Sequence, residues 1–162
     1  MNSELDLALE RVIRAPRSAV WAAWIDPRQF EQWWIPAPMA CRVDLWEPSM
    51  GGAFVTSVSE DGENFVPHMD ACFLLVEHLE RIVFTNALDS HWRPADPTPV
   101  RITAEITLVD HPEGTLYRAV VRHADPAART HHGELGFFEG WGAATAQLAG
   151  KAEEAGAAHG AE

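Results

Sequence analysis

Lysine and cysteine are scarce in this 162-residue chain. Lys151 is the single lysine, and 12 basic residues stand against 24 acidic ones, which gives a formal net charge of -12. A negative field of this size repels nucleic acid and anionic membrane surfaces, so we exclude nucleic acid as a partner. The two cysteines, Cys41 and Cys72, lack CxxC spacing. Their spacing speaks against a disulfide framework or a zinc site and predicts buried free thiols.

Targeting and membrane segments are also missing. The N-terminus has no basic stretch followed by an apolar one, and no apolar run approaches the ~20 residues that cross a bilayer. We therefore predict a cytoplasmic protein without membrane insertion. The chain lacks a phosphate-binding glycine loop, a dinucleotide fingerprint and a nucleophile elbow. No cofactor is expected, and we interpret Gly51-Gly52 as a turn.

Alternating apolar and polar residues predict strands over most of the chain. The first strand alternates from Leu5 and ends at Ala15-Pro16, and two short helices follow, the first capped by Ser18. Asp125 is expected to cap the final helical region, with Pro126 at its first position. Six further strands are expected over residues 42–47, 53–59, 65–77, 81–88, 100–108 and 116–122.

This element order predicts an α+β fold, a single domain over residues 1–155 followed by a flexible tail over 156–162. A curved antiparallel sheet of about seven strands must cover its apolar face, and only the C-terminal helix is long enough to do so. A sheet wrapped around one helix leaves a cavity between them. From Gly136 to Gly142, three aromatic residues alternate with three glycines, which indicates close approach of backbone or of a ligand.

Several short motifs, in this order along the chain, resemble the START-like superfamily, also called SRPBCC domain proteins. The motifs are Val12-Ile13-Arg14-Ala15-Pro16, Val20-Trp21 with Trp24, Trp33-Trp34, Val43-Asp44-Leu45, Gly51-Gly52, Arg81-Ile82-Val83-Phe84-Thr85, and Gly136-Phe137 with Gly140-Trp141. They are most similar to the branch named after the C-terminal domain of the activator of heat-shock protein 90 ATPase. The resemblance implies a helix-grip fold, which serves lipid carriers, cyclases, hormone receptors and co-chaperone domains. Where the family usually has His-x-Gly, this chain reads His68-Met69-Asp70.

Aromatic residues are the main candidates for lining the cavity. Trp21 and Trp24 lie at helical spacing and are expected in the core, whereas Trp34 and Trp141 at the junction of sheet and helix are expected to face a ligand. Asn86 is expected on an inward face, where its amide needs a hydrogen-bond partner. The full set of predicted ligand-binding residues is Trp34, Phe54, Thr56, His68, Asp70, Phe84, Asn86, Tyr117, Phe137 and Trp141.

Three polar residues are candidates for acid-base chemistry: His68, Asp70 and His132. In a regular strand His68 and Asp70 share a face, and burial would raise the pKa of Asp70 and keep His68 neutral. In the alternative register the apolar face that carries Met69 and Phe73 is the buried one, and both polar residues face water. The histidines have no i, i+4 or H-x-H spacing, so no metal site is expected.

These features lead to three hypotheses of function. The favoured one is a module that carries, sequesters or senses an apolar or aromatic small molecule, as a monomer or a homodimer. The second is a cofactor-free cyclase or hydrolase with Asp70 and His68 as acid and base. The third, implied by the family resemblance, is a co-chaperone of the heat-shock protein 90 type that acts in the stress response.

Overall fold

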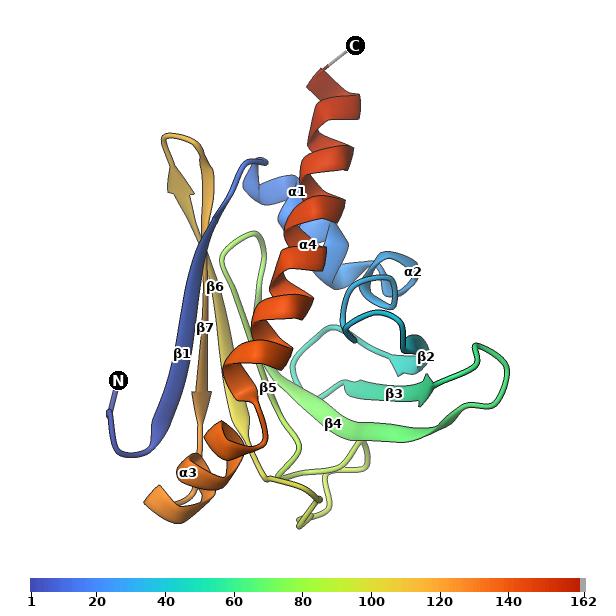
Figure 1. Ribbon diagram of the computed structural model, residues 1–162, viewed down its shortest axis with the longest axis vertical. Helices are drawn as coiled ribbons and strands as arrows, with labels where there is room; N and C mark the ends of the chain where they lie inside the picture. The colour runs from blue at the N-terminus through green and yellow to red at the C-terminus, as the bar shows by residue number, and fades with distance from the viewer. Residues whose placement is uncertain (161–162) are drawn as a thin grey trace.

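The sheet forms one wall of the molecule and the last helix crosses its concave side (Figure 1). The computed structural model describes residues 1–160. All seven strands are antiparallel, in the order β1-β7-β6-β5-β4-β3-β2. Their bounds are β1 Asp6–Ile13, β2 Ala40–Trp46, β3 Ala53–Ser59, β4 Val66–Glu77, β5 Arg81–Thr85, β6 Thr103–His111 and β7 Gly114–Arg122. The predicted helix-grip fold is confirmed.

Four helices complete the described part of the chain: α1 Arg17–Ile25, α2 Pro27–Phe30, α3 Pro126–Glu134 and α4 Phe137–Gly160. Asp125 caps α3 as predicted, because its side chain accepts a hydrogen bond of 2.8 Å from Ala128 N. Ser18 was the wrong cap for α1, which follows Pro16 without a side-chain cap. No helix of the described residues is both long and apolar enough to span a membrane.

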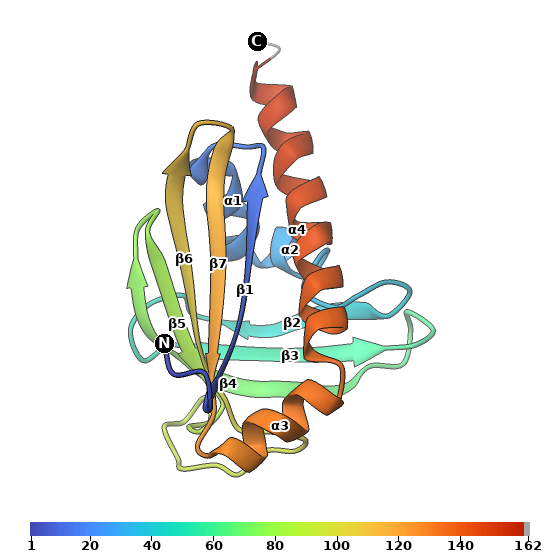
Figure 2. The same ribbon diagram turned by 60° about the vertical axis from the view of Figure 1, so that its left-hand side comes forward.

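The final helical region is broken in two. Gly136 has a φ of +93°, a conformation that favours glycine, and it separates α3 from α4. As a result α3 lies across the end of the sheet while α4 runs along its concave side (Figure 2). Helix α4 continues through Gly160, so the expected tail is helical as far as the structure describes it, and residues 161–162 lie outside the described residues.

Irregular pairing bends the half of the sheet that holds the cavity. The register shifts between Val43 and Leu45 in β2 and between Phe73 and Leu75 in β4. A third shift lies between β3 and β4, where Thr56 pairs with Met69 while Ser57 pairs with Pro67. Each extra residue is a bulge, and bulges increase the local twist and redirect side chains.

Aromatic residues from helices and strands meet in the core under α1 and α2. Trp24 and Trp33 are almost fully buried, as is Phe30, with ring centroids 5.1–5.2 Å apart. Both indoles are satisfied, since Trp24 Nε1 donates to Tyr117 Oη at 3.1 Å and Trp33 Nε1 donates to the Ala23 carbonyl at 2.8 Å. The core interpretation of Trp24 is confirmed, and the cluster braces the α2–β2 connection beside the cavity.

Candidate functional site

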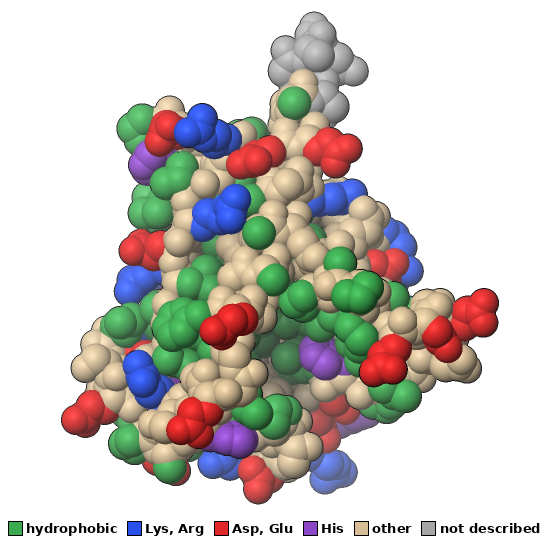
Figure 3. Space-filling view, viewed as in Figure 1, with side chains coloured by type: hydrophobic (Ala, Val, Ile, Leu, Met, Phe, Trp, Pro, Cys, Tyr) green, Lys and Arg blue, Asp and Glu red, His purple; other side chains and the backbone are tan. Residues whose placement is uncertain are grey.

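A cavity of about 300 Å³ lies between α4, β4 and the loop before β6. The space-filling view shows the hollow beside α4, with apolar and histidine side chains around it (Figure 3). This volume is at the small end for ligand pockets, so it suits a small aromatic molecule. The residues that line it are Trp33, Trp34, Ile35, Pro36, His68, Met69, Asp70, Asn86, Pro97, Thr98, Pro99, Val100, Ile102, Tyr117, His132, Gly140, Trp141, Ala144 and Thr145.

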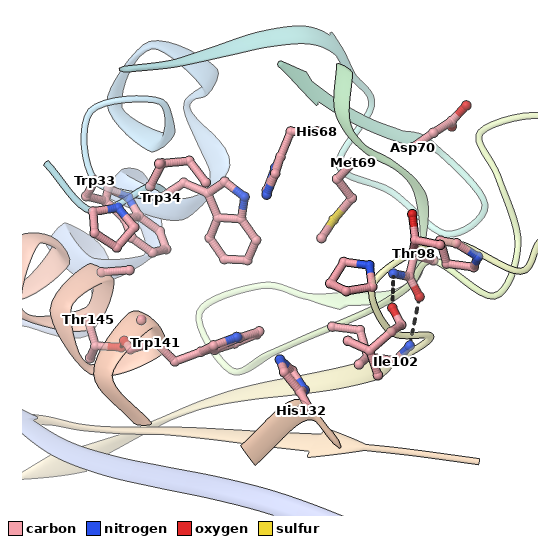
Figure 4. A pocket seen from close by; sticks show the side chains of 18 of the residues that line it. Trp33, Trp34, His68, Met69, Asp70, Thr98, Ile102, His132, Trp141 and Thr145 are labelled. Atoms are coloured by element: carbon pink, nitrogen blue, oxygen red, sulfur yellow. Dashed lines mark hydrogen bonds between the residues drawn. The ribbon is translucent and has the colours of Figure 1, made fainter. Parts of the chain in front are cut away.

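Trp34 and Trp141 form one wall of the cavity, as the sequence predicted for their side chains. Their ring centroids are 5.7 Å apart at 76°, an edge-to-face arrangement. Trp34 is 8% exposed, and its Nε1 is buried without a hydrogen-bond partner within the described residues. Figure 4 shows this nitrogen on the side of the indole that faces His68.

His68 reaches the cavity from β4 because it is the extra residue of the bulge. Its Nδ1 lies 3.1 Å from Thr56 Oγ1, so the predicted residue Thr56 supports His68 from the neighbouring strand. The ring keeps exposed surface at the cavity mouth, yet desolvation by the surrounding protein lowers the pKa of His68. A neutral imidazole therefore stands at this wall at pH 7.

Asp70 is among the residues that line the cavity, but its carboxylate does not point into the cavity beside His68 as predicted. The side chain points away from the cavity (Figure 4), and its Oδ1 accepts a hydrogen bond of 2.8 Å from Ser90 N. The physical reason is the bulge, which breaks the alternation between residues 68 and 70. The other prediction, that the apolar face of this strand is the buried one, agrees with the structure. Phe73 is fully buried and Met69 lines the cavity.

His132 enters from α3 on the opposite side of the cavity (Figure 4). Its Nδ1 lies 2.8 Å from Nε2 of His123, the residue after β7, and Nδ1 of His123 lies 2.8 Å from the Leu5 carbonyl. Desolvation, followed by the charges of His123 and His131, lowers the pKa of His132 to about 4. His123 is 7% exposed and was not predicted as a site residue, because it is nine positions from His132 and on a different element.

Asn86 holds the loop that closes the cavity. Its Nδ2 donates to the Val100 carbonyl at 3.1 Å, and its Oδ1 accepts from Ile102 N at 2.8 Å. The side chain is 8% exposed, so the expectation of a satisfied inward amide is met by protein partners. The loop residues Pro97 to Val100 also line the cavity. They were not predicted from the sequence, because alternation of apolar and polar residues locates strands and not loops.

Other predicted site residues contribute to packing instead. Phe54 and Phe84 are fully buried with ring centroids 4.8 Å apart, and Phe137 is 2% exposed. These three rings lie behind the cavity wall and do not line it. Tyr117 does line it, but its hydroxyl accepts from Trp24, and burial raises the pKa of this phenol. The described residues contain no group of three side chains placed to hold a metal ion.

Comparison with known proteins places this fold in a family. The model of the family described as "Activator of Hsp90 ATPase homolog 1-like protein" matches residues 14–153. No curated protein sequence matches the chain.

Solved structures of other proteins share this fold. A protein from Nitrosomonas europaea is 36% identical, with a TM-score of 0.84 over 97% of this chain and 99% of that one. A protein from Arthrobacter aurescens has the same fold at 22% identity, with a TM-score of 0.79 over 93% of this chain and 87% of that one. An AHSA1-like protein from Aeromonas hydrophila is 21% identical, with a TM-score of 0.63 over 94% of each chain. The family resemblance seen in the motifs is thereby confirmed: the chain belongs to the family of Activator of Hsp90 ATPase homolog 1-like proteins.

Proposed function

We propose that this protein binds an apolar or aromatic small molecule in the cavity between β4 and α4, as a carrier, sequestering or sensing module. The observation that supports this most is the cavity itself, about 300 Å³ in volume and walled by Trp34, Trp141 and Met69. Pockets for small molecules are concave and mostly apolar, with a few polar groups that orient the ligand. His68 and His132 supply such groups from opposite sides.

Binding accounts for these side chains better than acid-base catalysis does. The cyclase or hydrolase hypothesis needs Asp70 and His68 against one substrate, and Asp70 points out of the cavity toward Ser90. Lowered pKa values keep His68 and His132 neutral at pH 7, so neither is a strong general acid there. The co-chaperone hypothesis stays a prediction from the family resemblance.

A cavity-filling variant tests the proposal without weakening the fold. Gly140 lines the cavity from α4, and beyond its chain neighbours and the backbone of its own helix a Cβ atom added there meets nothing within 4 Å. Leucine at this position projects into empty space and favours the helix by roughly 0.8–1 kcal/mol over glycine. Gly150, exposed on the same helix and equally free of neighbours, provides the matched control.

The assay is a fluorescence titration with N-phenyl-1-naphthylamine, a neutral apolar dye. We expect saturable binding to the wild type and to Gly150→Leu, and at least tenfold weaker binding to Gly140→Leu. Urea denaturation should show both variants to be as stable as the wild type or more so. Equal dye binding by all three proteins would place the dye elsewhere and contradict the proposal.

A further inference from the structure

A chain of hydrogen bonds runs from the backbone of the N-terminal segment to the cavity. The Leu5 carbonyl lies 2.8 Å from Nδ1 of His123, and Nε2 of His123 lies 2.8 Å from Nδ1 of His132. The first of these atoms is a carbonyl oxygen, which only accepts hydrogen bonds. When both imidazoles are neutral, this acceptor determines where their protons lie.

The proton positions follow from the Leu5 end. His123 must carry its proton on Nδ1 in order to donate to the Leu5 carbonyl, and in the neutral ring Nε2 is then an acceptor. His132 must in turn carry its proton on Nδ1 in order to donate to that acceptor. The free nitrogen of neutral His132, Nε2, is therefore an unprotonated acceptor.

The surroundings of His132 favour this neutral form. Burial lowers the pKa of His132 most, and a positive charge on His123, the residue after β7, or on His131 of α3 would lower it further. Edge-to-face contact with Phe137, at 5.1 Å between ring centroids, fixes the ring plane. The side chain enters the cavity on the side opposite Trp34 and His68 (Figure 4).

We propose that His132 Nε2 accepts a hydrogen bond from the ligand, and that the ligand is a neutral aromatic molecule carrying an O–H or N–H donor, of the phenol or arylamine class. The inference rests on the proposed function and deepens it. The aromatic body packs between Trp34, Trp141 and Met69, while the donor meets His132. His123 acts as a positioning residue, because it holds His132 in the tautomer that leaves Nε2 free.

The test uses two probes with the same naphthalene frame: 2-naphthol, which has an O–H donor, and 2-methoxynaphthalene, in which a methyl group replaces the donor hydrogen. Calorimetry gives the ratio of their Kd values for the wild type and for His132→Phe, which keeps an aromatic ring against Phe137. One neutral hydrogen bond changes binding by up to about tenfold. We expect the preference for naphthol over the ether to fall about five- to tenfold in His132→Phe, with ether binding changed less than twofold. 2-Naphthylamine in place of naphthol distinguishes O–H from N–H donors.

Nitrogen NMR of the histidine rings tests the tautomer directly in the unmodified protein. In their neutral forms, His123 and His132 of the wild type should both carry the proton on Nδ1. In His123→Phe the Nδ1 proton of His132 loses its acceptor, so the ring should become a mixture of tautomers and the naphthol preference should fall about two- to threefold. A purely structural role of His123 would leave the tautomer of His132 unchanged.

The outcomes separate the two proposals. If both probes bind and their ratio is the same in wild type and His132→Phe, the donor does not meet His132; this inference is then overturned while the binding function stands. If neither probe binds the wild type, the binding function fails and this inference fails with it. A wild-type His132 protonated on Nε2 overturns the inference even if no variant folds.

Discussion

Replacing Asn86 should destabilise the protein by loosening the wall of the cavity. In Asn86→Ala two hydrogen bonds are lost, one from Nδ2 to the Val100 carbonyl and one from Ile102 N to Oδ1. Each is worth about 0.5–1.5 kcal/mol net, and a buried N–H left unpaired costs about 1–3 kcal/mol. Val100 is half-buried, so its carbonyl can turn to water, whereas Ile102 is 5% exposed. We therefore expect the free energy of unfolding to fall by roughly 2–4 kcal/mol.

Urea denaturation of the wild type and Asn86→Ala measures this change in free energy. Dye titration of the same two proteins measures whether the cavity still binds the dye. Asn86→Asp is the informative companion, since its carboxylate still accepts from Ile102 N but cannot donate to Val100. Burial raises the folded-state pKa of that aspartate, so its deficit in stability should shrink as the pH falls toward 4. A loss below about 1 kcal/mol in Asn86→Ala would refute the view that this amide holds the loop.

Two further predictions concern the polar residues of the site. Because the pKa of His132 is lowered from 6.5 to about 4, the unfolded chain binds more protons in this interval, and stability present above pH 6.5 should be lost as the pH falls toward 4. At 1.36 kcal/mol per unit, and discounted for partial exposure of the ring, the loss is about 1–2 kcal/mol. Urea denaturation between pH 7 and pH 4.5 should show this loss of stability in the wild type but not in His132→Phe. The same pH dependence in both proteins would contradict the prediction. Asp70→Asn should leave the affinity for dye and naphthol within twofold of the wild type, because the carboxylate faces Ser90; a larger change in calorimetry would show that Asp70 contacts the ligand.

The strands along the chain and the aromatic wall of the cavity could be predicted from the sequence. Alternation in the strands depends on neighbours along the chain, and the final helix is the one element long enough to cover the sheet. The predicted wall residues Trp34 and Trp141 do meet at the junction of sheet and helix. Large apolar side chains at the junction of sheet and helix line a pocket there whatever the exact register of the strands, so this prediction did not depend on the irregularities of the sheet.

The polar residues of the site could not be placed from the sequence, because their positions depend on irregularities that the alternation of apolar and polar residues does not show. One extra residue at His68 turned that side chain into the cavity and sent Asp70 outward, against the rule of alternation. Gly136 broke the last helical region, and the resulting placement of α3 brought His132 to His123.

The sequence by itself therefore determined the fold class and the apolar character of the cavity, because both follow from patterns that repeat along the chain. Only the tertiary structure decided which polar atoms face a ligand. A hydrogen-bond chain such as Leu5–His123–His132 joins residues that are distant in sequence. Its geometry arises because Leu5 just before β1 and His123 just after β7 meet helix α3, and no local pattern specifies that contact.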